Sequence, residues 1–348
     1  MNPTTLFILM SGLALGTTAT FASSHWFLAW MGLELNTLAI IPLMSQHHHP
    51  RAVEAATKYF LTQATAAAVL LFATVTNAWL TGQWDIQQMT HPLPSTMIVM
   101  ALALKMGLAP LHTWLPEVLQ GIDLTTALLL STWQKLAPFI LLLQIQQPHP
   151  TILVTLGLLS VVVGGWGGLN QTQLRKILAY SSIAHLGWLI IIMPYSPSLS
   201  LLTLALYFVL TFSTFITFKL SNSLNINSLA ASWTKLPLLA ALIPLIMLSL
   251  GGLPPLTGFM PKWLILSELT KQGMSLTATL IALSALLSLY FYLRLSYAVA
   301  LTIPPANMFS STPWRLYTNQ LKMPLAVSIS IATLLLPLAP TTAALLQL

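Results

Sequence analysis

Long apolar runs, separated by short polar or Pro/Gly-containing segments, dominate the pattern of this 348-residue chain. A helix needs about 20 residues to cross the hydrocarbon core of a bilayer, and eleven runs are about that long or longer. Membrane β-strands would instead show alternation over about ten residues. The predicted transmembrane helices cover residues 3–21, 26–44, 58–79, 96–121, 124–143, 151–169, 177–193, 199–221, 237–269, 275–301 and 323–347.

The composition agrees with a membrane protein, because 56% of the residues are hydrophobic and only 5% are charged. Soluble domains contain about 25% charged residues, so a soluble globular protein is excluded. The chain has no cysteine, which excludes a disulfide scaffold and a cysteine-ligated metal or iron–sulfur centre. Its 13 Lys and Arg residues form no patch, so no nucleic-acid partner is expected. The predicted fold is an all-α polytopic membrane protein, with residues 1–348 in a single membrane domain.

The basic residues between the predicted helices indicate the orientation of the chain. Loops on the inner side of a membrane are enriched in Lys and Arg, and every basic loop here is separated from the next by an even number of predicted helices. An N-terminus inside and a C-terminus outside follow from this parity. The first run has no preceding basic residue, so we expect a membrane helix and not a targeting peptide. The basic residues concerned are Arg51, Lys58, Arg175, Lys176, Lys219, Lys235, Arg315 and Lys322.

Two segments in the fourth and ninth runs align without a gap, residues 107–117 with residues 252–262. Proline removes a helical donor and clashes with the preceding turn, so breaks are predicted near 107–116 and near 251–261. The run 237–269 would also measure about 50 Å as a straight helix, which is too long for the membrane. The residues expected to break the helices are Gly107, Pro110, Gly252, Pro254 and Pro255.

The two breaks fall in the fourth helix of two successive sets of five. We therefore predict a first five-helix repeat at 1–145, a second at 149–302 and one additional C-terminal helix at 323–347. Because five is odd, the second repeat is expected to be inverted. Inverted repeats with discontinuous helices are typical of ion-coupled transporters. Two proline-kinked packing helices are the alternative.

Four charged residues lie near the middle of predicted helices: Glu34, Lys105, Lys135 and Lys262. Each costs about 2.5–3.5 kcal/mol to insert, which favours a function for them. Glu34 and Lys105 form the natural pair, and a lysine whose carboxylate partner can move away is a proton site that can be loaded and emptied. The alternatives are static ion pairs between helices and snorkelling lysines, which suit helix-end residues such as Lys58.

Histidines and glycines give weaker signals. His112 and His185 are candidate proton relays, because histidine titrates near neutral pH, although a buried histidine satisfied by a hydroxyl group explains either one equally well. The run His47–His49 has no acidic or cysteine companion, so no metal site is expected. The glycine-rich run 164–168 indicates close helix packing. No nucleotide-binding motif is present, so we expect no cofactor in this chain.

Residues 105–117, KMGLAPLHTWLPE, closely resemble the broken-helix motif of the antiporter-like subunits of respiratory complex I, which are relatives of subunits of multisubunit cation/proton antiporters. Residues 1–3 (MNP), 30–36 (WMGLELN) and 251–263 (GGLPPLTGFMPKW) resemble the vertebrate mitochondrial form. The resemblance covers essentially the whole chain. Compared with the bacterial fourteen-helix pattern, the first three helices are missing.

The resemblance implies a core subunit of proton-pumping NADH:ubiquinone oxidoreductase in the mitochondrial inner membrane, with its N-terminus in the matrix and its C-terminus in the intermembrane space. NADH, FMN, iron–sulfur clusters and ubiquinone would belong to other subunits of that complex. The implied partners are other membrane-arm subunits, including neighbouring antiporter-like and accessory subunits, and anionic lipids such as cardiolipin.

The resemblance also implies roles for the buried charges. Glu34 matches the channel glutamate of the family, paired with Lys105, while Lys135 matches the central lysine and Lys262 the distal one. His185 falls on the same polar axis by inference. Two alternatives remain open: a stand-alone cation/proton antiporter, and a structural scaffold of the membrane arm without its own proton path.

Overall fold

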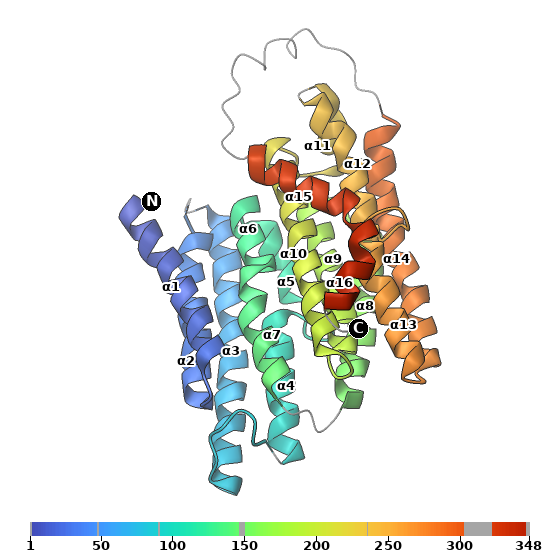
Figure 1. The fold of residues 1–348 in the computed structure, drawn as a ribbon. Helices are drawn as coiled ribbons and strands as arrows, with labels where there is room; N and C mark the ends of the chain where they lie inside the picture. Colours follow the sequence, from blue (N-terminus) through green and yellow to red (C-terminus); the bar gives the residue numbers. More distant parts are fainter. Residues whose placement is uncertain are drawn as a thin grey trace. The chain divides into compact units, whose positions relative to one another are not determined.

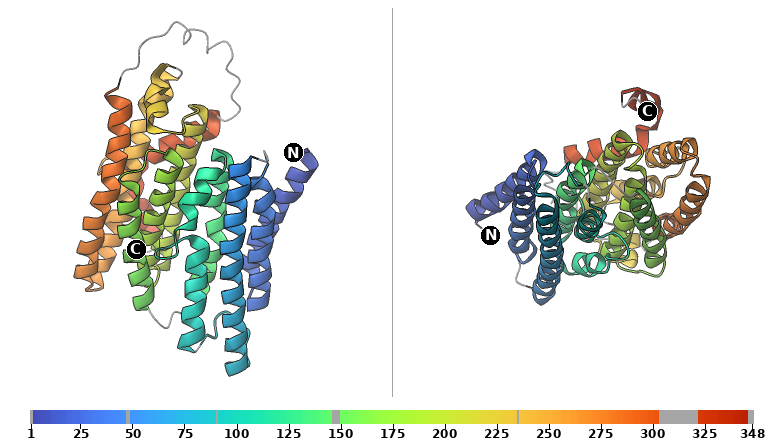
Figure 2. Two further views of the ribbon diagram at one scale, coloured as in Figure 1. Left: turned by 180° about the vertical axis from the view of Figure 1, so that it is seen from behind. Right: turned by 90° about the horizontal axis from the view of Figure 1, so that it is seen from below.

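The structure is a computed structural model that describes residues 2–46, 49–89, 91–145, 150–234, 236–302 and 322–345. Within these ranges all regular structure is helical, apart from two isolated β-bridges, His25 with Asp85 and Gln173 with Asn225. The prediction of an all-helical membrane protein is therefore confirmed for the described residues. Figures 1 and 2 show helices running side by side within each part of the chain.

Eight segments of the described chain are long and apolar enough to cross a membrane. Each overlaps one predicted transmembrane helix, because the length of such a helix follows from the length of the apolar run in the sequence. They are α1 (Pro3–Ala22), α2 (Trp26–Met44), α3 (Pro50–Thr81), the pair α6 (Leu124–Ser131) and α7 (Trp133–Gln144), α8 (Pro150–Gly168), α9 (Leu174–Ile192), α10 (Pro197–Leu220) and α14 (Ser275–Ala300).

Two of the other predicted helices are each divided into two pieces. The first pair is α4 (Pro92–Met106) and α5 (Trp114–Gly121), and the second is α12 (Pro237–Gly251) and α13 (Phe259–Lys271). Gly107 ends α4 with φ 79° and ψ 41°, and Gly252 ends α12 with φ 77° and ψ 44°. Glycine adopts this left-handed conformation without steric cost, so both helices end in the same way.

The last predicted helix, 323–347, is not one straight helix. α15 (Lys322–Leu334) is followed by a 3-10 turn, η4 (Leu336–Leu338), and by α16 (Ala339–Leu345). The two helical pieces are bent by 65°. Pro337 and Pro340 lie at the bend, and each removes a helical donor and clashes with the preceding turn.

The fifth predicted helix, 124–143, is also interrupted, which the sequence did not predict. Thr132, between α6 and α7, has φ −112° and ψ −71°. Its hydroxyl group donates to Leu128 O at 2.7 Å, and a side chain that competes for helix carbonyls in this way favours a bend. No proline or glycine marks the position. The interruption places Lys135 in the first turn of α7.

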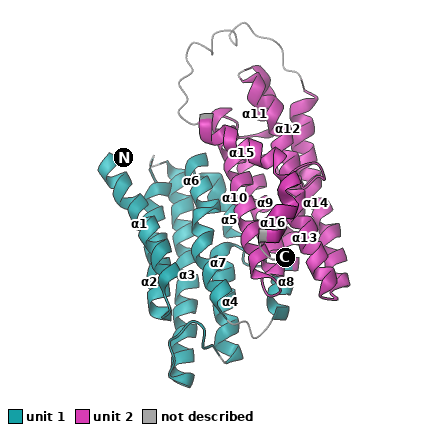
Figure 3. Cartoon of the chain, viewed as in Figure 1, with its two compact units in different colours: residues 1–157 teal, residues 158–348 magenta. Residues whose placement is uncertain are grey.

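The chain forms two compact units, residues 1–157 and residues 158–348 (Figure 3). In the first unit α1 packs along α2. A Cβ atom at Gly16 would lie 2.9 Å from the carbonyl oxygen of Gly32. Small residues at such contacts allow two membrane helices to approach closely.

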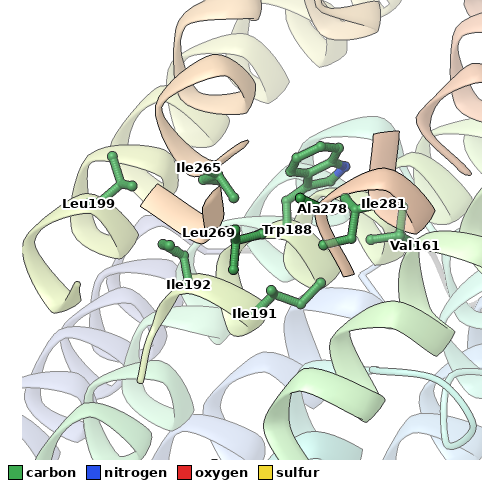
Figure 4. Close-up of a cluster of buried hydrophobic side chains, with 9 residues drawn as sticks. All are labelled: Val161, Trp188, Ile191, Ile192, Leu199, Ile265, Leu269, Ala278 and Ile281. Atoms are coloured by element: carbon green, nitrogen blue, oxygen red, sulfur yellow. The ribbon is translucent and has the colours of Figure 1, made fainter. Parts of the chain in front are cut away.

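The core of the second unit contains a cluster of buried side chains from α8, α9, α10, α13 and α14 (Figure 4). The glycine-rich run 164–168 lies where α8 packs closely on two of these helices, because Gly164 contacts the backbone of α9 and Gly165 contacts α14. α11 (Ile226–Ala230) and η1 (Ala231–Thr234) lie between α10 and α12 along the chain. The cluster comprises Val161, Trp188, Ile191, Ile192, Leu199, Ile265, Leu269, Ala278 and Ile281.

Candidate functional site

Lys105 lies in the last turn of α4, directly before the break. Its side chain is buried, with a relative exposure of 6%, and its ammonium nitrogen has no hydrogen-bond partner. The C-terminal end of a helix carries a partial negative charge, so α4 itself stabilises a cation here. This stabilisation replaces only part of the hydration that the buried ammonium group has lost.

Glu34, on α2, is partly buried. Among the described residues no ion pair joins Glu34 to Lys105 within 4.0 Å, although Glu34 is the acidic group whose charge acts on Lys105. The hydroxyl group of Thr37 lies 2.8 Å from the backbone oxygen of Glu34 and 3.1 Å from its Oε2, so its one proton is shared between these two acceptors. In this state the predicted pair is therefore separated, and the Glu34 carboxylate contacts Thr37 on its own helix.

A cavity in the first unit adjoins both Lys105 and Lys135. Lys135 is 2% exposed, and the structure brings it to the same cavity from the first turn of α7. Two of the four predicted proton sites thus meet at one place. The cavity is lined by Leu33, Asn36, Thr37, Tyr59, Gln63, Lys105, Met106, Trp114, Leu115, Leu130, Gln134, Lys135 and Pro138.

The lining of this cavity contains polar groups without protein partners. Asn36 and Gln63 are 2% and 3% exposed, yet both amide atoms of Asn36 and the Nε2 of Gln63 lack hydrogen bonds. Lys105 Nζ is a third such group. Buried polar groups in native proteins are almost always satisfied by protein or by ordered water, so this cavity has the chemistry of a water site.

Gln134 connects α7 to α2 beside the cavity, because its Nε2 donates to Asn36 O at 3.2 Å. Trp133 makes a similar bond, with its Nε1 3.4 Å from Leu13 O on α1. The interruption between α6 and α7 is thus anchored on the two N-terminal helices. Lys135, the next residue, is held at the cavity by these bonds.

Lys262 lies in the second unit, on α13. Its ammonium nitrogen donates to Gly251 O at 2.8 Å, across the break between α12 and α13. It also lies 5.9 Å from the centre of the Trp188 ring. A cation is stabilised both at a helix C-terminus and over an aromatic face, so Lys262 joins the two halves of the broken helix.

A second cavity, lined in part by Lys262, His185 and Tyr207, lies within the second unit. The rings of His185 and Tyr207 are 5.7 Å apart, and His185 Nε2 is 3.5 Å from the hydroxyl group of Tyr292. Of the two predicted relay histidines, His185 therefore shares a cavity with a predicted proton site. His112 lies in the break after α4, with Nδ1 3.3 Å from Pro110 O, and is not among the lining residues of the first cavity.

Sequence reasoning missed Thr37, Asn36, Gln63 and Gln134. The available signal was their polarity inside apolar runs, since each lies within a predicted transmembrane helix. Hydroxyl and amide side chains are common in membrane helices and are usually satisfied within their own bundle, so polarity alone did not distinguish these four. Within the described residues no three His, Asp or Glu side chains gather as a metal site.

Two family models match the chain. Residues 23–288 match the NADH:quinone oxidoreductase/Mrp antiporter transmembrane family, and residues 289–343 match the C-terminus of NADH dehydrogenase subunit 2. Similar proteins include NADH-ubiquinone oxidoreductase chain 2 of Tetraodon nigroviridis, 70% identical over 98% of both chains. The protein of the same name from Gadus morhua is 67% identical over the full length of both.

Solved structures show the same fold. A chain of respiratory complex I from Thermus thermophilus has a TM-score of 0.83 at 30% identity, covering 99% of this chain and 79% of that one. A chain of the Mrp complex from Dietzia has a TM-score of 0.80 at 15% identity, covering 97% of this chain and 75% of that one. On the sequence matches over its full length, the chain belongs to the family of NADH-ubiquinone oxidoreductase chain 2.

Proposed function

We propose that this chain is an antiporter-like subunit of proton-pumping NADH:ubiquinone oxidoreductase and that it translocates protons through its buried lysines. The observation that carries the proposal is the cavity in the first unit, where a buried ammonium group without a hydrogen-bond partner shares the lining with a second buried lysine. A static ion pair would instead place a carboxylate in hydrogen-bond contact with Lys105 Nζ, which has no such partner among the described residues. Family membership supplies the complex in which such a site can be driven.

In the proposed mechanism the position of Glu34 controls the proton on Lys105. When the carboxylate approaches, it favours the charged lysine, and when it withdraws toward Thr37, it favours release of the proton. Removal of a nearby carboxylate changes the proton affinity of a buried lysine by about 1.4–4 kcal/mol, which is enough to reverse its occupancy. The released proton passes by water to Lys135. Lys262 is the distal site of the path, with His185 as its candidate relay.

We also propose a membrane topology, a location and partners for this chain. Eleven transmembrane helices form two inverted five-helix repeats, 1–145 and 149–302, followed by an additional C-terminal span near 323–347. The protein lies in the mitochondrial inner membrane, with its N-terminus in the matrix and its C-terminus in the intermembrane space. Its partners are other membrane-arm subunits and anionic lipids such as cardiolipin. The redox cofactors, FMN and iron–sulfur clusters, are held by other subunits, as are the sites for NADH and ubiquinone.

The substitution Lys105→Met tests the proposal, because it keeps the length of the side chain and removes the proton site. We expect the number of protons translocated per electron to fall in the assembled complex. Lys271→Met is the matched control, since Lys271 is exposed and pairs only with nearby Glu268 at 3.3 Å. An unchanged stoichiometry in Lys105→Met would contradict the assignment, and cation exchange by the reconstituted chain alone would favour a stand-alone antiporter.

A further inference from the structure

An ion cluster lies on α3 and α5, close to the first cavity. Lys58 Nζ is 2.8 Å from Glu54 Oε1 and 2.9 Å from Glu117 Oε2. The three side chains are 43%, 62% and 54% exposed, in the order Lys58, Glu54 and Glu117. One lysine serves two carboxylates here, and the guanidinium group of Arg51, one turn before Glu54 on α3, also acts on Glu54.

The same two helices lead from this cluster to the cavity. Tyr59 and Gln63, which follow Lys58 on α3, line the cavity, as do Trp114 and Leu115, which precede Glu117 on α5. Gln63 is five residues beyond Lys58, which corresponds to about 8 Å along a helix. The cluster and the cavity therefore lie at successive heights along the interface between α3 and α5.

Polar groups without hydrogen-bond partners follow at the level of the cavity. Gln63 Nε2 and Lys105 Nζ are both buried and without hydrogen-bond partners, and both line the cavity. These unsatisfied donors require water, as argued above. The exposed carboxylates of the cluster and the unsatisfied groups of the cavity together outline a polar route.

Two aromatic side chains of the cavity lining come from the same two helices as the cluster. The rings of Tyr59 and Trp114 are 5.7 Å apart and meet edge to face, with an interplanar angle of 62°. Tyr59 is 2% exposed and Trp114 is 7% exposed. Tyr59 directly follows Lys58 and Trp114 lies three residues before Glu117, so each aromatic residue lies within one helical turn of the cluster, and both also line the cavity.

We infer that the Glu54–Lys58–Glu117 cluster is the proton-uptake mouth of this cavity, and that Tyr59 and Trp114 form the barrier between them. The ligand of the mouth is a hydronium ion. A proton binds the Glu117 carboxylate, and the resulting carboxyl group passes it by water to the neutral amine of Lys105, leaving a carboxylate and an ammonium ion. The mouth lies toward the Pro50 end of α3, which the pattern of basic residues predicts on the inner side.

This inference rests on the proposed function and is tested with Glu117→Gln in the complete complex, reconstituted in liposomes. We expect normal assembly and a severalfold slower proton translocation. Formic acid, a small permeant weak acid, should restore much of the lost rate relative to wild-type complex treated in the same way, because it can deliver protons past a missing carboxylate. Glu268→Gln is the matched control: it removes a carboxylate of the second unit that pairs with Lys271 on α13, and its translocation should be unchanged.

A normal rate in Glu117→Gln, or a loss that formic acid does not relieve, would overturn the inference. The Lys105→Met variant separates this outcome from failure of the proposed function. If Lys105→Met abolishes translocation while Glu117→Gln is normal, the cavity is a proton site whose mouth lies elsewhere. If Lys105→Met is also normal, the proposed function itself fails.

Discussion

Within the described part of the chain the Glu34 carboxylate contacts Thr37 and not Lys105, the partner that the sequence predicts. The hydroxyl group of Thr37 lies 2.8 Å from the backbone oxygen of Glu34 and 3.1 Å from Glu34 Oε2, while the same side chain lines the cavity that Lys105 also lines. The carboxylate thus contacts Thr37 and, among the described residues, makes no ion pair within 4.0 Å with the lysine on which its charge acts. A hydrogen bond to a charged group contributes about 1.5–3 kcal/mol, which is enough to hold one of two alternative positions of Glu34.

Thr37→Val tests this role, because valine has the same shape and lacks the hydroxyl group. The withdrawn position of Glu34 loses its donor, so we expect proton translocation to slow severalfold while the amount of assembled complex stays near normal. The measurement is the translocation rate of reconstituted complex. Thr155→Val is the control, since the Thr155 hydroxyl bonds only to Ile152 O in its own helix. Equal rates in the two variants would argue against a role for Thr37.

At the scale of the elements, the two broken helices end alike but are bridged differently. In the first unit the indole nitrogen of Trp114 donates to Leu104 O at 3.1 Å, and in the second unit Lys262 donates to Gly251 O. The gap-free alignment places Phe259 at the position of Trp114, and phenylalanine has no donor. A charged lysine therefore does in one unit what a neutral indole does in the other.

This difference predicts that the first break depends on the indole of Trp114. Trp114→Phe removes this bond, but Leu104 O still accepts from the Gly107 amide at 3.1 Å, so the cost is that of one net hydrogen bond, about 0.5–1.5 kcal/mol. We expect a lower temperature of inactivation for the assembled complex. Trp166→Phe provides the comparison, because Trp166 is 71% exposed. If both variants inactivate at the wild-type temperature, the indole bond does not stabilise the break.

At the scale of the whole molecule, each compact unit contains a helix that ends at a left-handed glycine before a break, and a cavity lined in part by a lysine. The proposed inverted repeats would give each unit the same arrangement with the opposite membrane orientation. This topology predicts which loops lie on the same side of the membrane, because an odd number of helices between two loops places them on opposite sides. The absence of cysteine from the sequence makes the experiment simple.

We expect Gln87→Cys and Asn227→Cys to react with a membrane-impermeant maleimide from opposite sides of the membrane. Both positions are exposed in the structure. Gln87 follows the third predicted helix and Asn227 follows the eighth, and five helices between them reverse the side. Labelling of Asn227→Cys from the matrix side and of Gln87→Cys from the other side is the expected result. Labelling of both from one side would contradict the count of helices between them.

The sequence by itself determined the helical membrane class and the positions of most long helices. Both depend on local free energies, namely the transfer of about 20 apolar residues into hydrocarbon and the internal hydrogen bonding of a helix. The positions where α4 and α12 end were also accessible locally, because Gly107 and Gly252 are followed closely by prolines. The interruption at Thr132 carries no such signal and was missed.

Only the tertiary structure decided which polar groups meet. Gln63 and Lys105 are 42 positions apart in sequence, and no local pattern predicts that both line one cavity. The separation of Glu34 from Lys105, the bond of Lys262 to Gly251 O and the ion cluster beside the Tyr59–Trp114 pair are of the same kind. Each depends on how neighbouring helices are rotated and packed, because in lipid the burial of apolar surface does not by itself select which helix faces meet.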